Sequence, residues 1–485
     1  MTAQTILPAN TLSSGYDVAN SVRLDGSSAY MGKTMGTPTD ADKYTFSFWC
    51  KRSKLGAQQS IFRSTDDGTN DSHVTFQSDD TLRFEEYGGS ASIGKLQTTQ
   101  VFRDVSSWYH IVLVYDSGNG TAGNRMRMYV NGSEVTAFGT DNNPSQNADS
   151  FFNKDGEALH FGRTSYGGGA NYFGGYVAEV VMCDGQAYAA SDFGEFDEDS
   201  PTIWKPKDVS GLTFGNNGFY LDFEDSSNLG NDANGGTDLT EVNIVATDQS
   251  TDTCTNNFAT LNPLTTWMSS DFNLSEGNLK IDIGNNTEGK AALATFGLTT
   301  GKWYWEVKYI SKTGDTYSQI GITDEIYNDA DSGSNKQGYG DYDYSYRGEY
   351  SGSGRKVNAG TFSNYGDTWT TGDIIGVALD LDNLAIYFSK NGTFQASGDP
   401  TSGASRTNAA FNISAASSTA SGYYFPVIAK EDADDPVFEF NFGGTNSASF
   451  AISSGNADAN GYGNFEYAVP SGYYSICTKN LAEFG

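Results

Sequence analysis

The acidic segment 195–200 comes closest to hydrolytic chemistry. Hydrolysis of a glycosidic bond uses two carboxyl groups, and one strand can present them in the pattern Glu-x-Asp-x-x-Glu. Glu195 and Asp197 fit the first two positions, but Ser200 stands at the last. Glu198 takes a place where a buried strand needs an apolar residue. We therefore predict a solvated acidic turn.

Histidines are too few and too scattered to form a catalytic or metal cluster. His73, His110 and His160 each lie in a strand-like run, and no Gly-x-Ser-x-Gly motif accompanies them. We expect each to be a hydrogen-bonded structural histidine. Glu306 lies between apolar neighbours and has no acidic partner nearby in the sequence. The sequence therefore predicts no catalytic residue and a protein that is not an enzyme.

Cysteine spacing excludes a zinc site of the usual kind, because Cys50, Cys183, Cys254 and Cys477 lie far apart without a CxxC pair. We expect no disulfide framework, and Cys50 and Cys183 end apolar runs typical of core strands. Asx-Gly turns could supply oxygen ligands for structural calcium, but none has the twelve-residue loop pattern. We therefore predict no cofactor, and the pattern leaves the question of a metal unanswered.

Recognition chemistry is better supported, because aromatic residues gather in two glycine-rich segments. Tyrosine offers a rigid ring with a polar tip, which stacks on sugars or fills protein pockets. The candidate ligand-binding residues are Tyr339, Tyr342, Tyr344, Tyr346 and Tyr350 in the segment 338–350, and Tyr166, Tyr172 and Phe173 in the segment 166–173. We predict that two of the first five lie on a binding surface; the alternative is that this segment is partly a strand.

The charge of the chain limits its partners. Sixty acidic residues against 29 basic ones give a formal net charge of −31, which repels nucleic acid and anionic membranes. We expect neither as a partner. The acidic surface serves solubility in salty water in one interpretation and holds divalent cations in the other. No 18-residue apolar run and no signal peptide is present, so we predict neither membrane insertion nor secretion by a signal of its own.

Short alternating runs bounded by turn residues predict an all-β chain of two tandem antiparallel β-sandwiches. Each sandwich contains an Asn-Gly pair between two such runs, at 131–132 and 391–392, which predicts a hairpin. The segment between the two sandwiches is rich in Gly, Asn and Pro and shows little periodicity, which predicts an extended connector. Two apolar runs within it indicate that it packs against a domain. The predicted boundaries are an N-terminal arm at 1–16, a first sandwich at 17–190, a connector at 191–264, a second sandwich at 265–450 and a C-terminal tail at 451–485.

The second sandwich resembles the SPRY family. The matching segments come in the order of that family and include Gly301-Lys-Trp-Tyr-Trp-Glu-Val307, Tyr387-Phe-Ser-Lys-Asn-Gly392 and Phe440-Asn-Phe-Gly443. The first sandwich is similar to concanavalin A-like, laminin-G-type domains through Phe46-Ser-Phe-Trp49 and Tyr129-Val-Asn-Gly132. Both resemblances imply β-sandwiches that bind a saccharide or a protein.

The whole arrangement, with Trp204-Lys-Pro206 between the two domains, resembles structural proteins of marine bacteriophages. This resemblance implies a non-catalytic virion component, such as a tail fibre or another appendage, that recognises a host surface glycan or protein. The alternative is a purely structural capsid decoration or tail adaptor protein. Other virion proteins are the further partners expected, and closed symmetry favours a homotrimer. The virion is the expected location, after synthesis in the host cytoplasm.

Overall fold

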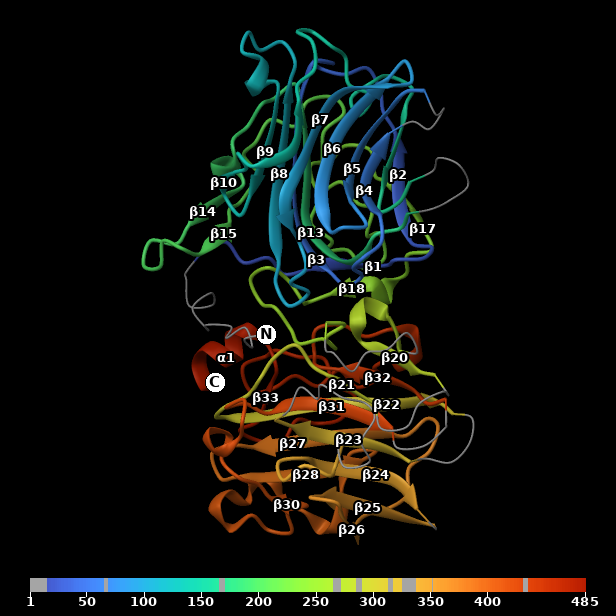
Figure 1. The fold of residues 1–485 in the computed structure, drawn as a ribbon, viewed down its shortest axis with the longest axis vertical. Coiled ribbons are helices and arrows are strands. Elements are labelled where there is room, and N and C mark those ends of the chain that lie inside the picture. Colours follow the sequence, from blue (N-terminus) through green and yellow to red (C-terminus); the bar gives the residue numbers. More distant parts are fainter. Residues whose placement is uncertain are drawn as a thin grey trace. The chain divides into compact units, whose positions relative to one another are not determined.

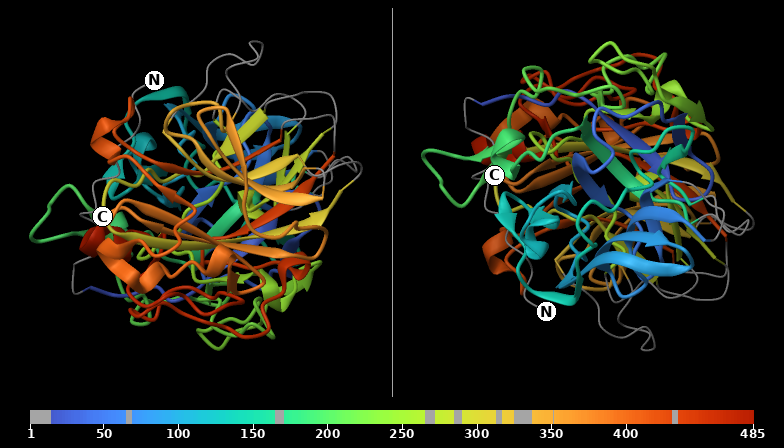
Figure 2. Two further views of the ribbon diagram at one scale, coloured as in Figure 1. Left: turned by 90° about the horizontal axis from the view of Figure 1, so that it is seen from below. Right: turned by 90° about the horizontal axis from the view of Figure 1, so that it is seen from above.

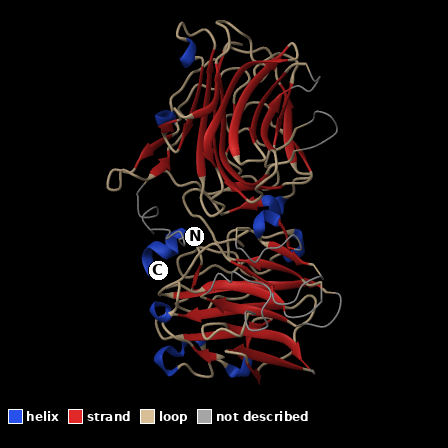
Figure 3. Cartoon of the chain, viewed as in Figure 1, coloured by secondary structure: helices blue, strands red, loops and turns tan. Residues whose placement is uncertain are grey.

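The chain folds into two compact units, built almost wholly of strands (Figures 1 and 3). The computed structural model describes residues 15–64, 69–164, 171–264, 272–284, 290–312, 317–324, 337–350, 352–430 and 435–485. Of these, 15–256 belong to the first unit and 257–485 to the second. The predicted all-β class with two sandwiches in tandem is confirmed.

The first unit consists of two antiparallel sheets, which can be followed from a second direction in Figure 2. Among the described residues each has eight strands. The first sheet contains β1 (Ser21–Asp25), β3 (Lys43–Arg52), β8 (Tyr109–Asp116), β9 (Met126–Val130), β10 (Ser133–Glu134), β13 (Gly174–Asp184), β16 (Phe219–Leu221) and β18 (Gln249–Ser250). The second contains β2 (Tyr30–Thr34), β4 (Gln59–Ser64), β5 (Asp71–Phe76), β6 (Thr81–Gly88), β7 (Ala91–Val101), β11 (Phe138–Asn142), β12 (Ala158–Phe161) and β17 (Thr240–Val242).

Strand β13 is buried on both faces, which shows how this unit is layered. Val177, Val180 and Met182 face the core between the sheets. Val181 and Cys183 point the other way, into a second apolar cluster that contains Phe193, Val209 and Phe214. Side chains alternate along a strand, so the segment after β13 must cover the outer face of the first sheet. A β-bulge between Ala178 and Val181 shifts the register.

The structure corrects the predicted connector at 191–264. Up to Asn256 this segment is part of the first unit: β16 pairs with β13, β17 with β2 and β18 with β1. Ala259 and Leu261 already belong to the core of the second unit. The apolar runs therefore pin the segment to the domains, as predicted. Its short pairing strands carry too little periodicity to be recognised as parts of a sheet.

Trp204 explains why the hairpin at 131–132 needs glycine. Asn131 and Gly132 have φ of 47° and 78°, as expected for the Asn-Gly turn. A Cβ on Gly132 would lie 2.2 Å from the Trp204 ring, which packs on the turn from β15 (Trp204–Pro206). Strand β15 pairs with β14 (Gly194–Phe196) in a separate ribbon. The Trp204 Nε1 also donates a 2.9 Å hydrogen bond to His110 Nδ1.

Replacing Trp204 by alanine is expected to destabilise the first unit by about 2–3 kcal/mol, because the ring is half-buried and its loss exposes the turn and leaves His110 without this donor. The unfolding midpoint in urea measures this. Replacing Phe196, which is 44% exposed beside the same ring, is the control and should change the midpoint little. Equal midpoints for Trp204→Ala and the wild type would contradict the packing role.

The second unit repeats the two-sheet plan with nine and six strands among its described residues. The larger sheet contains β19 (Phe272–Ser275), β20 (Lys280–Ile283), β22 (Lys302–Ser311), β27 (Ile374–Asp380), β28 (Ala385–Lys390), β29 (Thr393–Phe394), β30 (Phe411–Asn412), β32 (Val437–Asn441) and β33 (Tyr474–Ser475). The smaller contains β21 (Lys290–Leu293), β23 (Ser318–Thr323), β24 (Tyr344–Tyr350), β25 (Ser353–Asn358), β26 (Thr361–Asn364) and β31 (Phe425–Lys430). The helix α1 (Thr478–Phe484) ends the chain.

The predicted C-terminal tail at 451–485 is folded into this unit. Strand β33 pairs in parallel with β22, and Phe465 and Tyr473 cover the outer face of the larger sheet. Asp458 fastens the tail by accepting hydrogen bonds from the Ser475 backbone and the Asn480 side chain. The tail therefore completes the second unit, much as 191–256 completes the first.

Candidate functional site

Ionisable side chains form a continuous row across the outer face of the second sheet of the first unit. The row crosses β7, β6, β5, β4 and β12 in register, through Lys95, Glu85, His73, Arg63 and His160. The neighbours of these residues along each strand, such as Phe84 and Val74, face the core. Alternation therefore directs the whole row outward.

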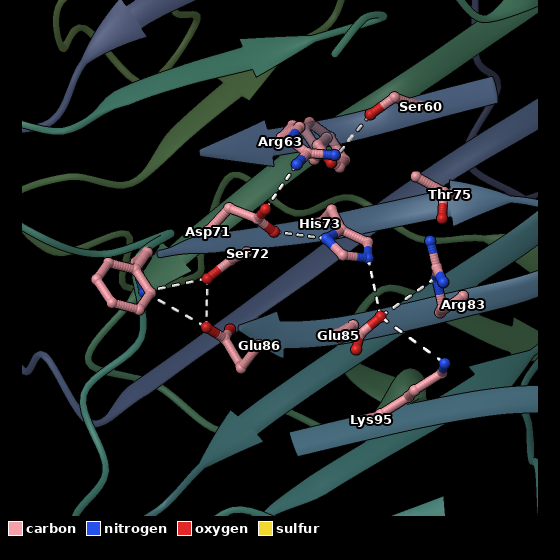
Figure 4. Close-up of polar contacts among 12 residues, drawn as sticks. Ser60, Arg63, Asp71, Ser72, His73, Thr75, Arg83, Glu85, Glu86 and Lys95 are labelled. Carbon is pink, nitrogen blue, oxygen red and sulfur yellow. Dashed lines mark hydrogen bonds and ion pairs between the residues drawn. The ribbon is translucent and has the colours of Figure 1, made fainter. Parts of the chain in front are cut away.

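His73 lies at the centre of this row, between two carboxylates (Figure 4). Its Nδ1 is 2.6 Å from Asp71 Oδ1, and its Nε2 is 3.1 Å from Glu85 Oε2. Arg63 Nη2 lies 2.6 Å from the other oxygen of Asp71. Both ring nitrogens of His73 have a carboxylate partner, and the contact with Glu85 links β5 to β6.

Glu85 is held as an anion. Burial alone would raise its pKa, but the hydrogen bond and charge of His73, with help from Arg83, lower the pKa to about 2. Arg83 Nε and Lys95 Nζ lie 3.4 and 3.9 Å from Glu85 Oε2. A carboxyl with such a pKa donates no proton near neutral pH, so Glu85 is unsuited to the general-acid role in glycoside hydrolysis.

An aromatic and basic corner lies at the end of the row, and its four side chains are half-exposed. The Arg163 guanidinium lies 3.8 Å from the centre of the Tyr30 ring, and its Nη2 is 3.3 Å from His160 Nε2. The Tyr30 ring is 5.9 Å from the His160 ring and 6.4 Å from the Tyr172 ring. We call these four residues the Arg163 corner. The central residues His73, Glu85 and Arg63 are nearly buried, so the accessible parts of the row are its two ends, at Lys95 and at this corner.

Two tyrosines of the segment 338–350 lie in the core, which corrects the prediction for them. Tyr344 and Tyr346 are 4% and 0% exposed and line the core of the second unit from β24. Tyr339 and Tyr342 are half-exposed and remain candidates. The sequence already indicated this, because Tyr344 and Tyr346 are two residues apart and alternate residues of a strand lie on the same face. The side chain of Tyr350, at the end of β24, lies outside the described part.

The aromatic candidates of the first unit divide in the same way. Phe173 is fully buried in the core and cannot contact a ligand, which corrects that prediction. Tyr172 is half-exposed and belongs to the Arg163 corner. Tyr166 lies outside the described residues. The other members of the corner, Tyr30 and Arg163, were not recognised from the sequence, since they follow no glycine-rich pattern.

Residues 197–200 form an acidic turn, as predicted for the segment 195–200, whereas Glu195 lies on β14. Asp197 Oδ1 accepts hydrogen bonds from the backbone N–H groups of Asp199 and Ser200, and Glu195 is exposed. Lys205 Nζ lies 3.5 Å from both Glu195 and Asp197. These contacts close a turn rather than align acids on one strand.

His110 is the structural histidine that the sequence predicts. Its ring stacks on Trp49 at 4.6 Å and binds Ser47 Oγ and Trp204 Nε1. Burial lowers its pKa to about 3, so it is neutral at physiological pH. Cys50 and Cys183 are buried in apolar clusters, also as predicted, and none of the four cysteines, all of which lie in the described ranges, forms a disulfide.

Three buried glutamates were not anticipated as titrating groups. Burial raises the pKa of Glu86 to about 7, of Glu179 to about 8 and of Glu306 to about 7. Glu179 accepts hydrogen bonds from the Tyr220 hydroxyl. Glu306, a lone acid in sequence, accepts hydrogen bonds from the backbone of 466 and 467 in the tail. Their partners come from distant segments, so they act as structural anchors.

Within the described ranges, no group of three or more His, Cys, Asp or Glu side chains is placed to hold a metal ion. Nor does any helix in those ranges have the length and apolarity to cross a membrane.

Comparison with known proteins agrees with this architecture. Residues 25–189 match the concanavalin A-like lectin/glucanases superfamily, and residues 302–445 match the SPRY domain. The chain carries a concanavalin A-like domain followed by a SPRY domain. The first domain contains the Arg163 corner, and the SPRY domain contains Tyr339 and Tyr342.

Relatives match about a quarter of the chain. Ran-binding protein 10 of Danio rerio is 34% identical over 125 residues, which are 24% of this chain and 20% of that protein. Ran-binding protein 9 of Homo sapiens is 31% identical over 125 residues, 24% of this chain and 16% of that protein. The match therefore spans about a fifth of their length. The solved SPRY domain of human HERC1 is 17% identical, with a TM-score of 0.27, covering 37% of this chain and 96% of that structure.

Proposed function

We propose that this chain is a non-catalytic recognition protein whose concanavalin A-like domain binds a surface saccharide at the Arg163 corner. The observation that carries the proposal is the corner itself: two tyrosine rings, a histidine and an arginine, half-exposed at the end of a rigid ionic row. Aromatic rings stack on the apolar faces of sugars, and the polar groups fix orientation. The row holds this geometry before any ligand arrives.

The absence of enzymatic activity is part of this proposal. The paired acids on the face are Asp71, which forms an ion pair with Arg63, and Glu85, which lies beside Arg83 and Lys95. Since the pKa of Glu85 is about 2, the acid–base pair of a glycosidase is not in place. Release of sugar from a bound polysaccharide by the purified protein would contradict this part.

The biological setting that we propose is a bacteriophage particle, with the protein as a tail fibre or other appendage that contacts a host glycan or protein. The support is the resemblance of the domain order and of the Trp204-Lys-Pro206 segment to phage structural proteins. We propose a homotrimer whose remaining surface contacts other virion proteins. Immunogold labelling of intact particles would locate the protein, and its absence from the particle would refute this setting.

Binding to a panel of neutral and acidic cell-surface polysaccharides tests the recognition role. Tyr30→Ala with Tyr172→Ala should weaken binding at least about tenfold, because two stacking rings are lost. The matched double variant Tyr339→Ala with Tyr342→Ala, in the SPRY domain, should bind normally. The recognition role fails if the intact oligomer binds no saccharide. If only the control pair loses binding, the site lies in the SPRY domain instead.

A further inference from the structure

Arg163 is one of three arginines of the first domain, with Arg125 and Arg127, for which the described residues supply no carboxylate partner, in a chain with 60 acidic and 29 basic residues. Arg23, Arg52, Arg63 and Arg103 of the same domain each form an ion pair with an aspartate. Within the described ranges, the contacts of Arg163 are with the Tyr30 ring and His160 Nε2. An arginine held away from acids in so acidic a chain is suited to an external anion.

Stacking on the Tyr30 ring orders the Arg163 guanidinium before an anion binds. Because it lies 3.8 Å from the Tyr30 ring centre, the side chain is restricted before binding, and less entropy is lost when it forms hydrogen bonds. A guanidinium that stacks through its face keeps its N–H donors at the edge, where they match the two oxygens of a carboxylate or sulfate.

The ionic contacts of the row and the corner involve more cations than carboxylates. Among the described residues the cations are Arg63, Arg83, Lys95 and Arg163, and the carboxylates are Asp71 and Glu85. The chain as a whole carries −31. Charges more than about 8–10 Å away are screened at physiological ionic strength. The electrostatic potential that an anion experiences at this face is therefore set mainly by the nearby cations.

We propose that the Arg163 corner binds an acidic saccharide, with the guanidinium of Arg163 pairing with a uronate carboxylate or a sulfate ester. Tyr30 and Tyr172 contact the faces of the sugar rings beside the acid group. His160 contributes a nitrogen next to the same group, 3.3 Å from Arg163 Nη2. This inference rests on the proposed saccharide binding and adds the class of sugar to it.

Two matched pairs of probes test the acid requirement with the full-length protein. Oligogalacturonate is compared with its methyl ester, and dextran sulfate oligomers with dextran. The acidic member of at least one pair should bind about tenfold or more tightly, and Arg163→Gln should reduce that preference to about twofold or less. Which pair shows the preference distinguishes carboxylate from sulfate. Affinity for the acid should fall with added salt.

Arg127→Gln is the matched control, because Arg127 also lies over a tyrosine, at 6.0 Å from the Tyr129 ring, but on the first sheet. It should leave the preference intact. Equal binding of acidic and neutral members overturns the acid class but leaves saccharide binding standing. Absence of binding to all four probes, and to the broader panel, overturns both. Equal binding of polyglutamate shows that charge alone is recognised and also overturns the inference.

Discussion

Asp184→Ala is expected to destabilise the concanavalin A-like domain by about 3–5 kcal/mol, which is the largest effect of a single substitution that we predict. Asp184 is fully buried at the end of β13. Its carboxylate accepts hydrogen bonds from the backbone of Thr39, Asp40 and Asn217 and from the Asn153 side chain, at 2.6–3.3 Å. Alanine would leave these donors without their acceptor.

Urea denaturation measures the effect, and Asp458→Ala is the matched control. Asp458 is the corresponding buried acceptor of the SPRY domain, so its loss should lower the stability of that domain and leave the concanavalin A-like domain unchanged. An unfolding midpoint of Asp184→Ala equal to that of the wild type would contradict the stabilising role of the Asp184 hydrogen bonds.

The second large effect is a loss of stability with rising pH, caused by Glu179. Its pKa is about 8 in the folded domain, because burial outweighs its hydrogen bonds, whereas the pKa of an ordinary glutamate is about 4.5. Between these values the folded state holds a proton that the unfolded state has released, so the free energy of unfolding falls as pH rises. The neutral carboxyl therefore stabilises fully below about pH 4.5, and on the order of 5 kcal/mol is lost by about pH 8.

Glu179→Gln should flatten this dependence, because glutamine does not titrate. Between pH 5 and 8 the free energy of unfolding of the variant should fall less steeply, by about 1.4 kcal/mol per pH unit. Glu86 also has a raised pKa, so part of the slope should remain. Urea unfolding at several pH values gives the slopes, with exposed Glu195→Gln as the control. Identical slopes for Glu179→Gln and the wild type would rule out Glu179 as the cause.

Much of the fold could be predicted because the deciding interactions are local. The Asn-Gly hairpins are an example: both residues must adopt positive φ, and the pair does so at little cost. Alternating runs likewise place β3, β8 and β22 without knowledge of their partners. Local rules were insufficient for β17 and β18, which are short and gain their stability only by pairing with β2 and β1.

The candidate site was less predictable, since composition does not show which side of a strand a residue occupies. Tyr344 and Tyr346 share a face with the core, so their rings stabilise the SPRY domain instead of meeting a ligand. The Arg163 corner joins Tyr30 of β2 with His160 of β12, Arg163 of the loop after it and Tyr172 just before β13. Tyr30 lies more than a hundred residues before the other three and meets them through the pairing of β2 with β12.

The sequence by itself determined an all-β chain of two tandem sandwiches, because turn chemistry and alternation act between near neighbours, and the resemblance of its motifs indicated a concanavalin A-like domain followed by a SPRY domain. Only the tertiary structure decided that the segments after each sandwich cover one sheet, and that a row of charges crosses the other. Both depend on register, since a shift of one residue would exchange the core and outer faces of every strand. The position of Arg163 beside Tyr30 and His160 could therefore be recognised only after the sheets were paired.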